Sequence, residues 1–365
     1  MKKILLTLTA LVAVVCSFSQ EFSLTHDGLT RTYRLHTPVG YNADSLYPLV
    51  INMHGLGSNA LEQEFYTAFN DVADSAAFIV AYPNGIDETW NVSSATGTDD
   101  VGFISALIDT IDAQYSINLE RVYATGMSMG GFMSYRLACE LADRIAAIAS
   151  VTGLQAFYPC NPDRPVPVVQ FHGTADPVVP YTGVPTTISN WVDHNLCPTT
   201  PVITDLPDID TNDNSTVTVS YYGLCEESTE VILYTIINGE HTWPGASYII
   251  GVTNQDIKAS YEIWNFFNKY TLQGSTGLDS DYDKQKMACF FYPNPVHNLA
   301  TVKLSYQPST QFDFRIFDMT GKLVLEQKRI INSRFLIDCS EIPGGFYIAV
   351  LSKGKVLSYQ KIIIQ

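Results

Sequence analysis

The sequence has 365 residues, and 46% of them are hydrophobic, so the chain can bury a sizeable core and is not disordered. This length fits two compact domains better than one. Lysine and arginine number 21 against 37 aspartate and glutamate residues, giving a net charge of −16. A surface of that sign repels nucleic acid and anionic lipid, so we expect neither as a partner.

The first 20 residues have the pattern of a secretory signal peptide. Lys2 and Lys3 precede an apolar run over 4–15, which is too short to span a bilayer as a helix. No later segment has the length and apolarity of a transmembrane helix. Lipidation at Cys16 is the alternative, but Val15 before it is bulkier than that modification prefers. We expect a secreted protein, extracellular or at the cell surface.

Export bears on the state of the cysteines, because disulfides form and persist outside the cytoplasm. Of 7 cysteines, removal of Cys16 with the leader leaves an even number, which favours disulfides in an oxidising compartment. Sequential pairing, Cys139 with Cys160 and Cys197 with Cys225, is the simplest arrangement, although sequence alone does not fix connectivity. The remaining two are Cys289 and Cys339, for which free buried thiols are the alternative to a bond.

Residues 21–272 alternate short apolar runs with amphipathic segments. Such repetition predicts an α/β fold with a mostly parallel sheet and helices on both faces. Strands are expected over 48–53, 77–82, 121–125, 145–151, 166–171 and 231–236. Helices are expected over 101–115, 129–142 and 259–270.

The pattern changes after residue 272. Residues 273–286 are polar without apolar periodicity, which indicates a linker. Residues 287–365 hold short strands separated by turn residues and predict a small β-sandwich. The expected strands are 300–306, 312–317, 322–325, 335–337, 346–351 and 356–364.

A Gly-x-Ser-x-Gly motif stands at 126–130, between an expected strand and an expected helix. A sharp turn there holds Ser128 in a strained conformation, and a Cβ at Gly126 or Gly130 would clash. The turn lifts the hydroxyl above the sheet, where the helix N-terminus points at the reacting carbonyl. The motif predicts a catalytic nucleophile of the α/β-hydrolase type; a chance match is the alternative.

A nucleophilic serine needs a base and an orienting acid, which this fold supplies in the order Ser, Asp or Glu, His. Asp176 follows an expected buried strand, and His241 follows the late strand at 231–236. Both positions fall at the edge of the sheet where active residues collect. The alternatives are a turn-forming Asp176 and a surface His241. His194 and His172 compete as bases, but His172 precedes the acid and breaks the order.

Two backbone N–H groups should stabilise the oxyanion that the serine creates. Met129 supplies one because it follows the nucleophile, and the glycine-containing loop at 54–58 supplies the other. We expect Leu56 in this role, with Gly55 as the near alternative. His54 is expected to hold the loop by hydrogen bonds.

Trp90 and Trp243 lie on loops near the expected site. Their rings fit stacking on a sugar or a phenolic acyl group, with local packing as an equal alternative. The sequence has no metal-ligand spacing, no phosphate loop and no dinucleotide fingerprint, so neither a metal nor a cofactor is expected.

From 49 to about 270 the chain resembles the secreted esterases grouped with polyhydroxybutyrate depolymerases and with feruloyl and acetylxylan esterases, carbohydrate esterase family one. The matching stretches are 54–57, 82–85 with 90–91, 99–103, 126–132, 171–177 and 241–245. The resemblance implies an α/β-hydrolase fold and Ser128, Asp176 and His241 as a catalytic triad. It also implies disulfides near Cys139–Cys160 and Cys197–Cys225.

The tail resembles the type A sorting domain of the type IX secretion system of Bacteroidetes. The matching stretches are 292–295, 318–322, 344–347 and 361–364. This resemblance implies export by the type IX machinery, followed by removal of the tail or surface attachment. A carbohydrate-binding β-sandwich is the alternative, and the tail's lack of tryptophan argues against it.

The sequence therefore predicts a secreted serine esterase that acts through an acyl-serine intermediate and needs no cofactor. The expected substrates are feruloyl or acetyl esters of plant-wall polysaccharide, and the first alternative is a polyhydroxyalkanoate. A non-catalytic polysaccharide-binding module is the alternative of another class. A peptidase would need an inserted domain to admit a peptide, and the sequence shows none.

Overall fold

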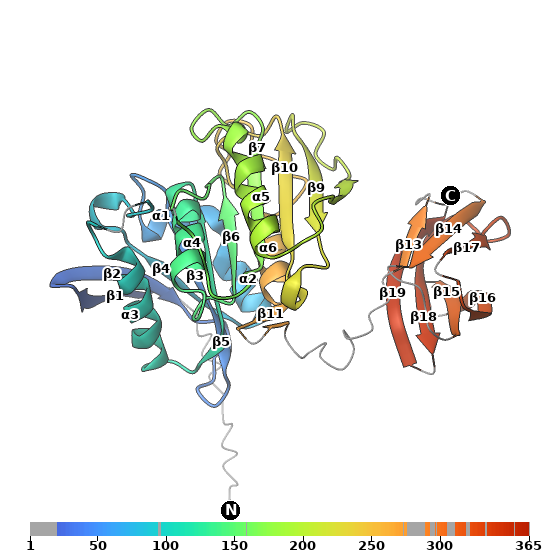
Figure 1. Cartoon of the computed structure of the whole chain (residues 1–365), viewed down its shortest axis with the longest axis horizontal. Helices are drawn as coiled ribbons and strands as arrows, with labels where there is room; N and C mark the ends of the chain where they lie inside the picture. Colours follow the sequence, from blue (N-terminus) through green and yellow to red (C-terminus); the bar gives the residue numbers. More distant parts are fainter. Residues whose placement is uncertain are drawn as a thin grey trace, which may run out of the picture. The chain divides into compact units, whose positions relative to one another are not determined.

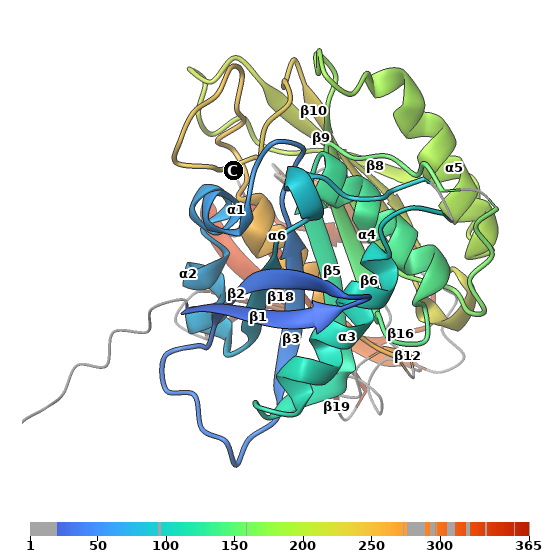
Figure 2. The same cartoon turned by 90° about the vertical axis from the view of Figure 1, so that its left-hand side faces the viewer.

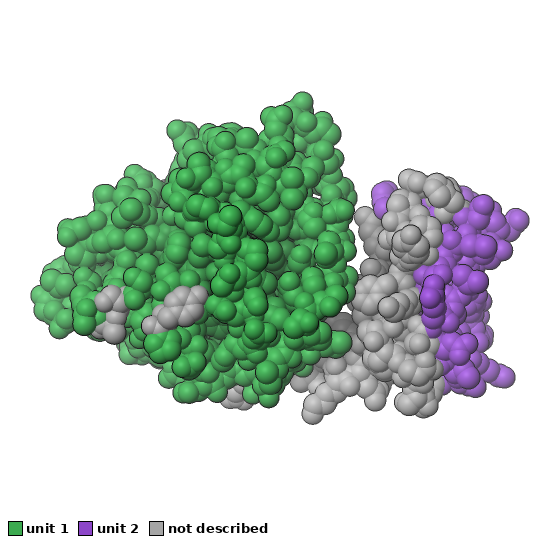
Figure 3. Space-filling model, turned by 45° about the horizontal axis from the view of Figure 1, so that its top comes forward, with its two compact units in different colours: residues 1–276 green, residues 277–365 purple. Residues whose placement is uncertain are grey.

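A computed structural model of the chain describes residues 20–365 except 94, 95, 158, 273, 276–288, 293–295, 297, 305–310, 319–321, 333, 354 and 365. The expected signal peptide, apart from residue 20, and most of the expected linker lie outside the described residues. The chain divides into two compact units, residues 1–276 and residues 277–365 (Figure 3). The division falls within the stretch expected to be the linker.

The first unit is built on one sheet of ten strands, in the order β1-β2-β4-β3-β5-β6-β7-β10-β9-β8 (Figure 1). Strands β4, β3, β5, β6, β7 and β10 are parallel neighbours. The mostly parallel sheet is thus confirmed. The strands are β1 (Gln20–His26), β2 (Leu29–His36), β3 (Tyr47–Met53), β4 (Ile79–Pro83), β5 (Ile117–Met127), β6 (Ala147–Val151), β7 (Val168–Gly173), β8 (Val202–Asp205), β9 (Thr216–Tyr222) and β10 (Val231–Ile237).

Helices cover both faces of this sheet (Figure 2). They are α1 (Ala60–Thr67), α2 (Phe69–Ala76), α3 (Asp100–Asp112), α4 (Met129–Glu140), α5 (Val184–His194) and α6 (Ala259–Phe267). Residues of α3, α4 and α5 share one core cluster with one face of the sheet, and residues of α2 and α6 share a second cluster with the other.

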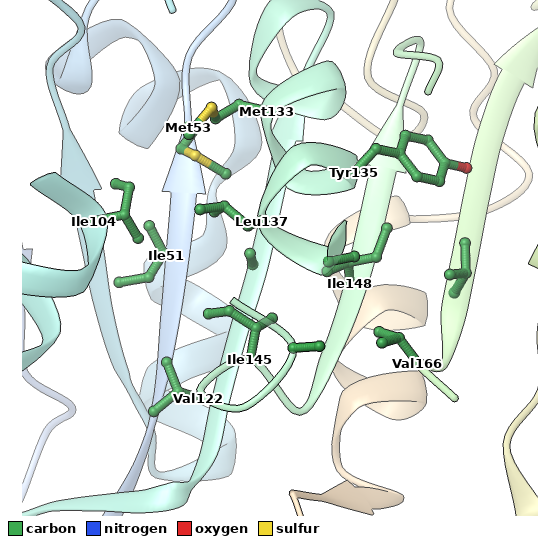
Figure 4. Close-up of a cluster of buried hydrophobic side chains, with 14 of the residues drawn as sticks. Ile51, Met53, Ile104, Val122, Met133, Tyr135, Leu137, Ile145, Ile148 and Val166 are labelled. Carbon is green, nitrogen blue, oxygen red and sulfur yellow. The ribbon is translucent and has the colours of Figure 1, made fainter. Parts of the chain in front are cut away.

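Successive residues of the central strands belong alternately to one core and to the other. In β3, Leu49 and Ile51 belong to the core under α3 and α4, whereas Val50 belongs to the core under α2 and α6. Figure 4 shows Ile51, Val122 and Ile148 from neighbouring strands in one cluster with side chains of α4 such as Met133 and Leu137. Burial on both faces explains why these strands are continuous apolar runs in the sequence.

Four strands, two at each end of the sheet, were not predicted. β1 pairs with β2 and β2 with β4 in antiparallel fashion, and the same holds for β8 with β9 and β9 with β10. The outer strands face solvent and carry polar side chains, as in β8, all four residues of which are exposed, and even β2 alternates buried with partly exposed residues. They therefore lack the apolar run by which the central strands were recognised.

The parallel arrangement places the carboxyl ends of β5, β7 and β10 at the same edge of the sheet. Ser128 follows β5, Asp176 follows β7 and His241 follows β10. Ser128 and His241 are 113 positions apart in the sequence, and the order of the strands brings them to the same edge.

Two disulfides brace the first unit. Cys139 in α4 is bonded to Cys160, with Cα atoms 5.0 Å apart, and Cys197 to Cys225, with Cα atoms 4.0 Å apart. Sequential pairing is confirmed. Cys339 is a buried free thiol, and Cys289 lies in a strand of the second unit. In the described part of the chain, no helix has the length and apolarity needed to cross a membrane.

The second unit has two antiparallel sheets, β13-β14-β17 and β16-β15-β18-β19. Side chains of both sheets, such as Val302 and Phe314, belong to one core, so the expected small β-sandwich is confirmed. The strands are β13 (Cys289–Tyr292), β14 (Leu299–Leu304), β15 (Phe312–Asp318), β16 (Leu323–Ile330), β17 (Arg334–Asp338), β18 (Gly345–Lys353) and β19 (Lys355–Ile364). A further short pair, β11 (Tyr270–Thr271) and β12 (Gly274–Ser275), ends the first unit.

Candidate active site

Ser128 stands on the sharp turn between β5 and α4, with φ 53° and ψ −117°. A positive φ in a residue with a Cβ costs on the order of 1–3 kcal/mol, which surrounding structure must supply. The Ser128 N–H donates to the Val151 carbonyl at 2.8 Å, and the Thr152 hydroxyl lies 3.2 Å from the same nitrogen. The neighbouring strand β6 therefore fixes the serine above the sheet.

Gly126 and Gly130 allow this turn to approach β3. A Cβ added to Gly126 would lie 2.5 Å from the Met53 carbonyl oxygen, and one added to Gly130 would lie 2.0 Å from the same atom. Neither contact is sterically allowed, and a backbone carbonyl at the end of a buried strand cannot withdraw. The clash expected from the motif therefore has a definite partner, the last residue of β3.

His241 and Asp176 are joined by a hydrogen bond of 2.7 Å between Nδ1 and Oδ2. The other oxygen of Asp176 accepts hydrogen bonds of 2.8 Å from the N–H groups of Val178 and Val179. Burial by itself would raise the pKa of Asp176, but the hydrogen bonds from His241 and the two N–H groups outweigh it and lower that pKa. The carboxylate is charged at neutral pH and aligns the imidazole.

The two competing histidines are occupied elsewhere. His172 Nε2 donates to the Val179 carbonyl at 2.8 Å, and its Nδ1 accepts from the Gln170 amide at 3.0 Å. Burial lowers the pKa of His172, so this ring stays neutral. His194, the last residue of α5, contacts the Arg164 carbonyl at 3.1 Å. Both alternatives are structural histidines in this fold.

Ser128 and His241 line one cavity of about 460 Å³. Most of the remaining lining is apolar or aromatic and comes from α1 and the loop that follows His241. These residues are Gly55, Leu56, Ser58, Glu62, Gln63, Phe65, Tyr66, Met127, Tyr248 and Ile250. Sites for small organic ligands have this size and character.

The loop after β3 lies beside the serine. A Cβ added to Gly55 would be 3.3 Å from the Ser128 Cβ, and Leu56 lines the cavity. His54 donates from Nδ1 to the Gly55 carbonyl at 2.7 Å and accepts at Nε2 from the Gly85 N–H at 2.9 Å. The carbonyl of Gly55 and the N–H of Leu56 belong to one planar peptide and point in opposite directions. His54 therefore sets the direction of the Leu56 N–H.

Met129 is the first residue of α4, so its N–H is among those that have no partner inside the helix. The positive end of the helix dipole lies at the same place. Two candidate donors, Leu56 and Met129, thus flank Ser128 on the chain segments nearest to it.

The expectation that Trp90 and Trp243 stack on substrate is not supported, because 2% and 1% of their surfaces are exposed. The Trp90 indole donates to the His54 carbonyl at 3.0 Å, behind the loop of Leu56. The Trp243 indole donates to the Ser260 hydroxyl at 3.0 Å. Both rings pack under loops that carry site residues, which is the alternative considered from the sequence.

The aromatic lining residues were missed by sequence reasoning. Phe65 and Tyr66 belong to α1, a helix that was not predicted, and Tyr248 and Ile250 follow His241 without a motif. The sequence offers one signal, the apolar pair Leu61 and Phe65 at helical spacing, and the structure shows that both side chains are exposed on α1.

Comparisons with known proteins find a family of esterases and a secretion sorting domain. Residues 31–186 match the family described as Esterase PHB depolymerase, and residues 290–365 match a secretion system C-terminal sorting domain. A probable feruloyl esterase C of Aspergillus niger is 30% identical over 244 residues, covering 65% of this chain and 83% of its own.

A bifunctional acetylxylan esterase/xylanase of Neocallimastix patriciarum is 30% identical over 250 residues. That match covers 68% of this chain but only 34% of the relative, so the chain spans about a third of its length. The solved acetyl xylan esterase from Aspergillus awamori is 15% identical, with a TM-score of 0.50, and the match covers 61% of this chain and 94% of that one. At that identity the likeness shows the same fold.

Proposed function

The chain belongs to the PHB depolymerase family of esterases, and we propose that it hydrolyses carboxylic esters through an acyl intermediate on Ser128. The observation that carries this proposal is the arrangement of three side chains. Asp176 holds His241 by a 2.7 Å hydrogen bond, and His241 shares a cavity with a serine on a strained turn. Nucleophile, base and orienting acid are the parts that acyl transfer requires.

In the proposed mechanism His241 takes the proton of Ser128 as the hydroxyl oxygen attacks the ester carbonyl. The N–H groups of Leu56 and Met129 stabilise the resulting oxyanion, and removing one such donor costs about 3 kcal/mol. Collapse expels the alcohol, which receives the proton from His241. Water then attacks the acyl-serine with His241 again as base, which releases the acid and restores Ser128. Ser128, His241, Asp176 and the two N–H groups, together with water, are the groups that these steps use.

For the substrate we propose feruloyl esters of plant-wall polysaccharide. A cavity of about 460 Å³ with aromatic walls is far larger than an acetyl group needs. A phenolic cinnamoyl group would use that apolar surface, and the relative from Aspergillus niger bears the name of a feruloyl esterase. Acetyl xylan and a polyhydroxyalkanoate are the competing substrates.

A panel of three substrates ranks these proposals. We expect the highest kcat/KM on methyl ferulate, with lower values on acetylated xylan and a hydroxybutyrate oligomer. A higher value on the oligomer would instead identify a polyhydroxyalkanoate depolymerase. Negligible turnover of all three, with p-nitrophenyl acetate also intact, would contradict the esterase assignment itself.

The second unit carries a secretion system sorting domain over 290–365, which assigns the protein to the extracellular space or the cell surface. We propose that the machinery is the type IX system, on the strength of the stretches at 344–347 and 361–364. We also propose that the first domain ends at residue 272, that 273–286 is a linker, and that the second domain begins at residue 287. The residues that line the cavity around Ser128, among those the structure describes, belong to the first unit.

A further inference from the structure

Tyr66 is placed where it can contact substrate, although no catalytic step uses it. It is the next-to-last residue of α1, and its side chain lines the cavity together with Ser128 and His241. Its hydroxyl oxygen accepts a hydrogen bond of 3.2 Å from the N–H of Trp243. Trp243 is two residues beyond His241, so the phenol is fixed relative to the catalytic histidine.

The proton of this hydroxyl is left available. Among the described residues, the Trp243 N–H is the one hydrogen-bond partner of the phenol, and it is a donor. Burial raises the pKa of Tyr66, although the hydrogen bond from Trp243 opposes this rise, so the proton is retained at neutral pH. A half-buried hydroxyl that already accepts one bond has its O–H left to offer to a ligand oxygen.

The other residues that line the cavity determine which kind of ligand group can reach the Tyr66 hydroxyl. Phe65, Tyr248 and Ile250 line the same cavity and favour an apolar or aromatic group. Gln63 is buried, and its amide donates to the Asn52 side chain at 2.8 Å, so it is engaged within the core. The other hydroxyls on this wall belong to Ser58, which donates to the Glu62 carboxylate at 2.8 Å, and to Tyr248, which is exposed. Tyr66 is therefore the half-buried neutral donor of the wall, held in place by Trp243.

We propose that Tyr66 is a specificity-determining residue whose O–H donates to an oxygen substituent on the aromatic acyl group of the bound ester. The inference rests on the proposed esterase function and adds the group that separates oxygenated cinnamoyl esters from unsubstituted ones. A site that hydrogen-bonds a substrate oxygen discriminates against the analogue without it, because the buried partner is then left unpaired.

The test compares methyl ferulate with methyl cinnamate, which has the same ester and chain but no ring oxygens. In the full-length protein, we expect Tyr66→Phe to lower the ratio of the two kcat/KM values by about tenfold, the size of one hydrogen bond. Tyr261→Phe is the matched control, because it removes a phenol oxygen from an exposed position on α6 outside the cavity. This control should leave the ratio unchanged.

The ratio of kcat/KM on methyl ferulate to kcat/KM on methyl cinnamate distinguishes a loss of selectivity from a displacement of the loop that carries His241. Tyr66→Phe also leaves the Trp243 N–H without its acceptor, and any resulting displacement of His241 lowers turnover of both esters alike. An unchanged ratio, whatever the absolute rates, would overturn the role of Tyr66 while the esterase function stands. If the wild-type protein does not hydrolyse p-nitrophenyl acetate, the result instead contradicts the esterase function on which the inference rests.

Discussion

Asp176 accepts three hydrogen bonds, from His241 and from the N–H groups of Val178 and Val179. Those bonds keep the carboxylate charged, oriented and buried at the end of β7. Its role in the proposed reaction is to hold His241 in the tautomer that leaves Nε2 free to accept the proton of the serine.

Replacing Asp176 with Asn tests that role. The amide preserves shape but favours the wrong imidazole tautomer, so we expect kcat on p-nitrophenyl acetate to fall by about 10⁴-fold, with a much smaller change in KM. Asp44→Asn, at an exposed position on the loop before β3, is the matched control and should retain full activity. A loss of less than tenfold in Asp176→Asn would assign the carboxylate to turn formation.

Two buried histidines should make stability depend on pH. Burial lowers the pKa of His54 and of His172, so below about pH 6.5 the unfolded chain binds protons that the folded chain excludes. Stability is therefore fully present above about pH 6.5 and decreases as pH falls toward the lowered values. Asp176, whose pKa is also lowered, adds to the loss at pH values below its usual range.

Urea unfolding at pH 7.5 and pH 5.5, followed by tryptophan fluorescence, measures this effect. All 4 tryptophans, at positions 90, 191, 243 and 264, lie in the first unit, so the signal reports that unit alone. We expect a smaller free energy of unfolding at pH 5.5. An equal or larger value there would mean that neither imidazole is kept neutral by burial.

For single residues, the sequence predicts polar side chains with a chemical role better than it predicts which aromatic side chains line the cavity. Ser128, Asp176 and His241 were identified because a motif and a chain order constrain them, and the structure brings all three to one sheet edge. Trp90 and Trp243 were placed at the substrate because they lie on loops, yet a loop position does not determine burial. Tyr66 was missed because nothing local distinguishes a cavity-facing tyrosine from any other.

The elements that carry the site owe their positions to strand order. Central strands were predicted because burial on both faces makes them continuous apolar runs. Helices α1 and α2 were missed: each has only eight residues, and Ala68 between them has a positive φ of 47° that interrupts the helical period. Helix α5 carries buried Ile188 and Trp191 three residues apart, a helical spacing that sequence analysis overlooked.

The disulfide between Cys197 and Cys225 should stabilise the first unit mainly by restricting its unfolded state. The sequence separation of 28 residues corresponds to about 3–4 kcal/mol of chain entropy, within the range usually measured. Replacing both cysteines with Ala should lower the free energy of unfolding, measured by tryptophan fluorescence, by about 2–4 kcal/mol.

The control for this variant is Cys339→Ala, which alters a buried free thiol in the second unit. Because no tryptophan lies in that unit, the fluorescence transition should not move. A shift as large in the control as in the double variant would indicate that the two units unfold together.

The molecule as a whole divides its tasks between two units with separate cores. The described residues that line the cavity around Ser128 belong to the first, and the match to a sorting domain falls in the second. In the sequence, the polar stretch at 273–286 separates two unlike patterns, continuous apolar strands before it and short strands with turns after it.

A chain that ends at Thr276 tests the division. We expect its kcat/KM on p-nitrophenyl acetate to stay within about twofold of the full-length value, because the proposed triad and the cavity are intact. Expression in the native host should leave the shortened chain inside the cell envelope, while the complete chain reaches the surface or medium. Surface delivery of the shortened chain would contradict a sorting role for the second unit.

Covalent labelling shows directly whether Ser128 is the nucleophile. A fluorophosphonate reacts with a serine only where a base and an oxyanion site activate it. We predict one phosphonyl group per chain, located by peptide mass spectrometry at Ser128, appearing at the same rate as ester hydrolysis is lost, and no labelling in Ser128→Ala. Active protein that loses hydrolysis with the label on another residue, or keeps full hydrolysis with Ser128 labelled, would show that Ser128 is not the nucleophile.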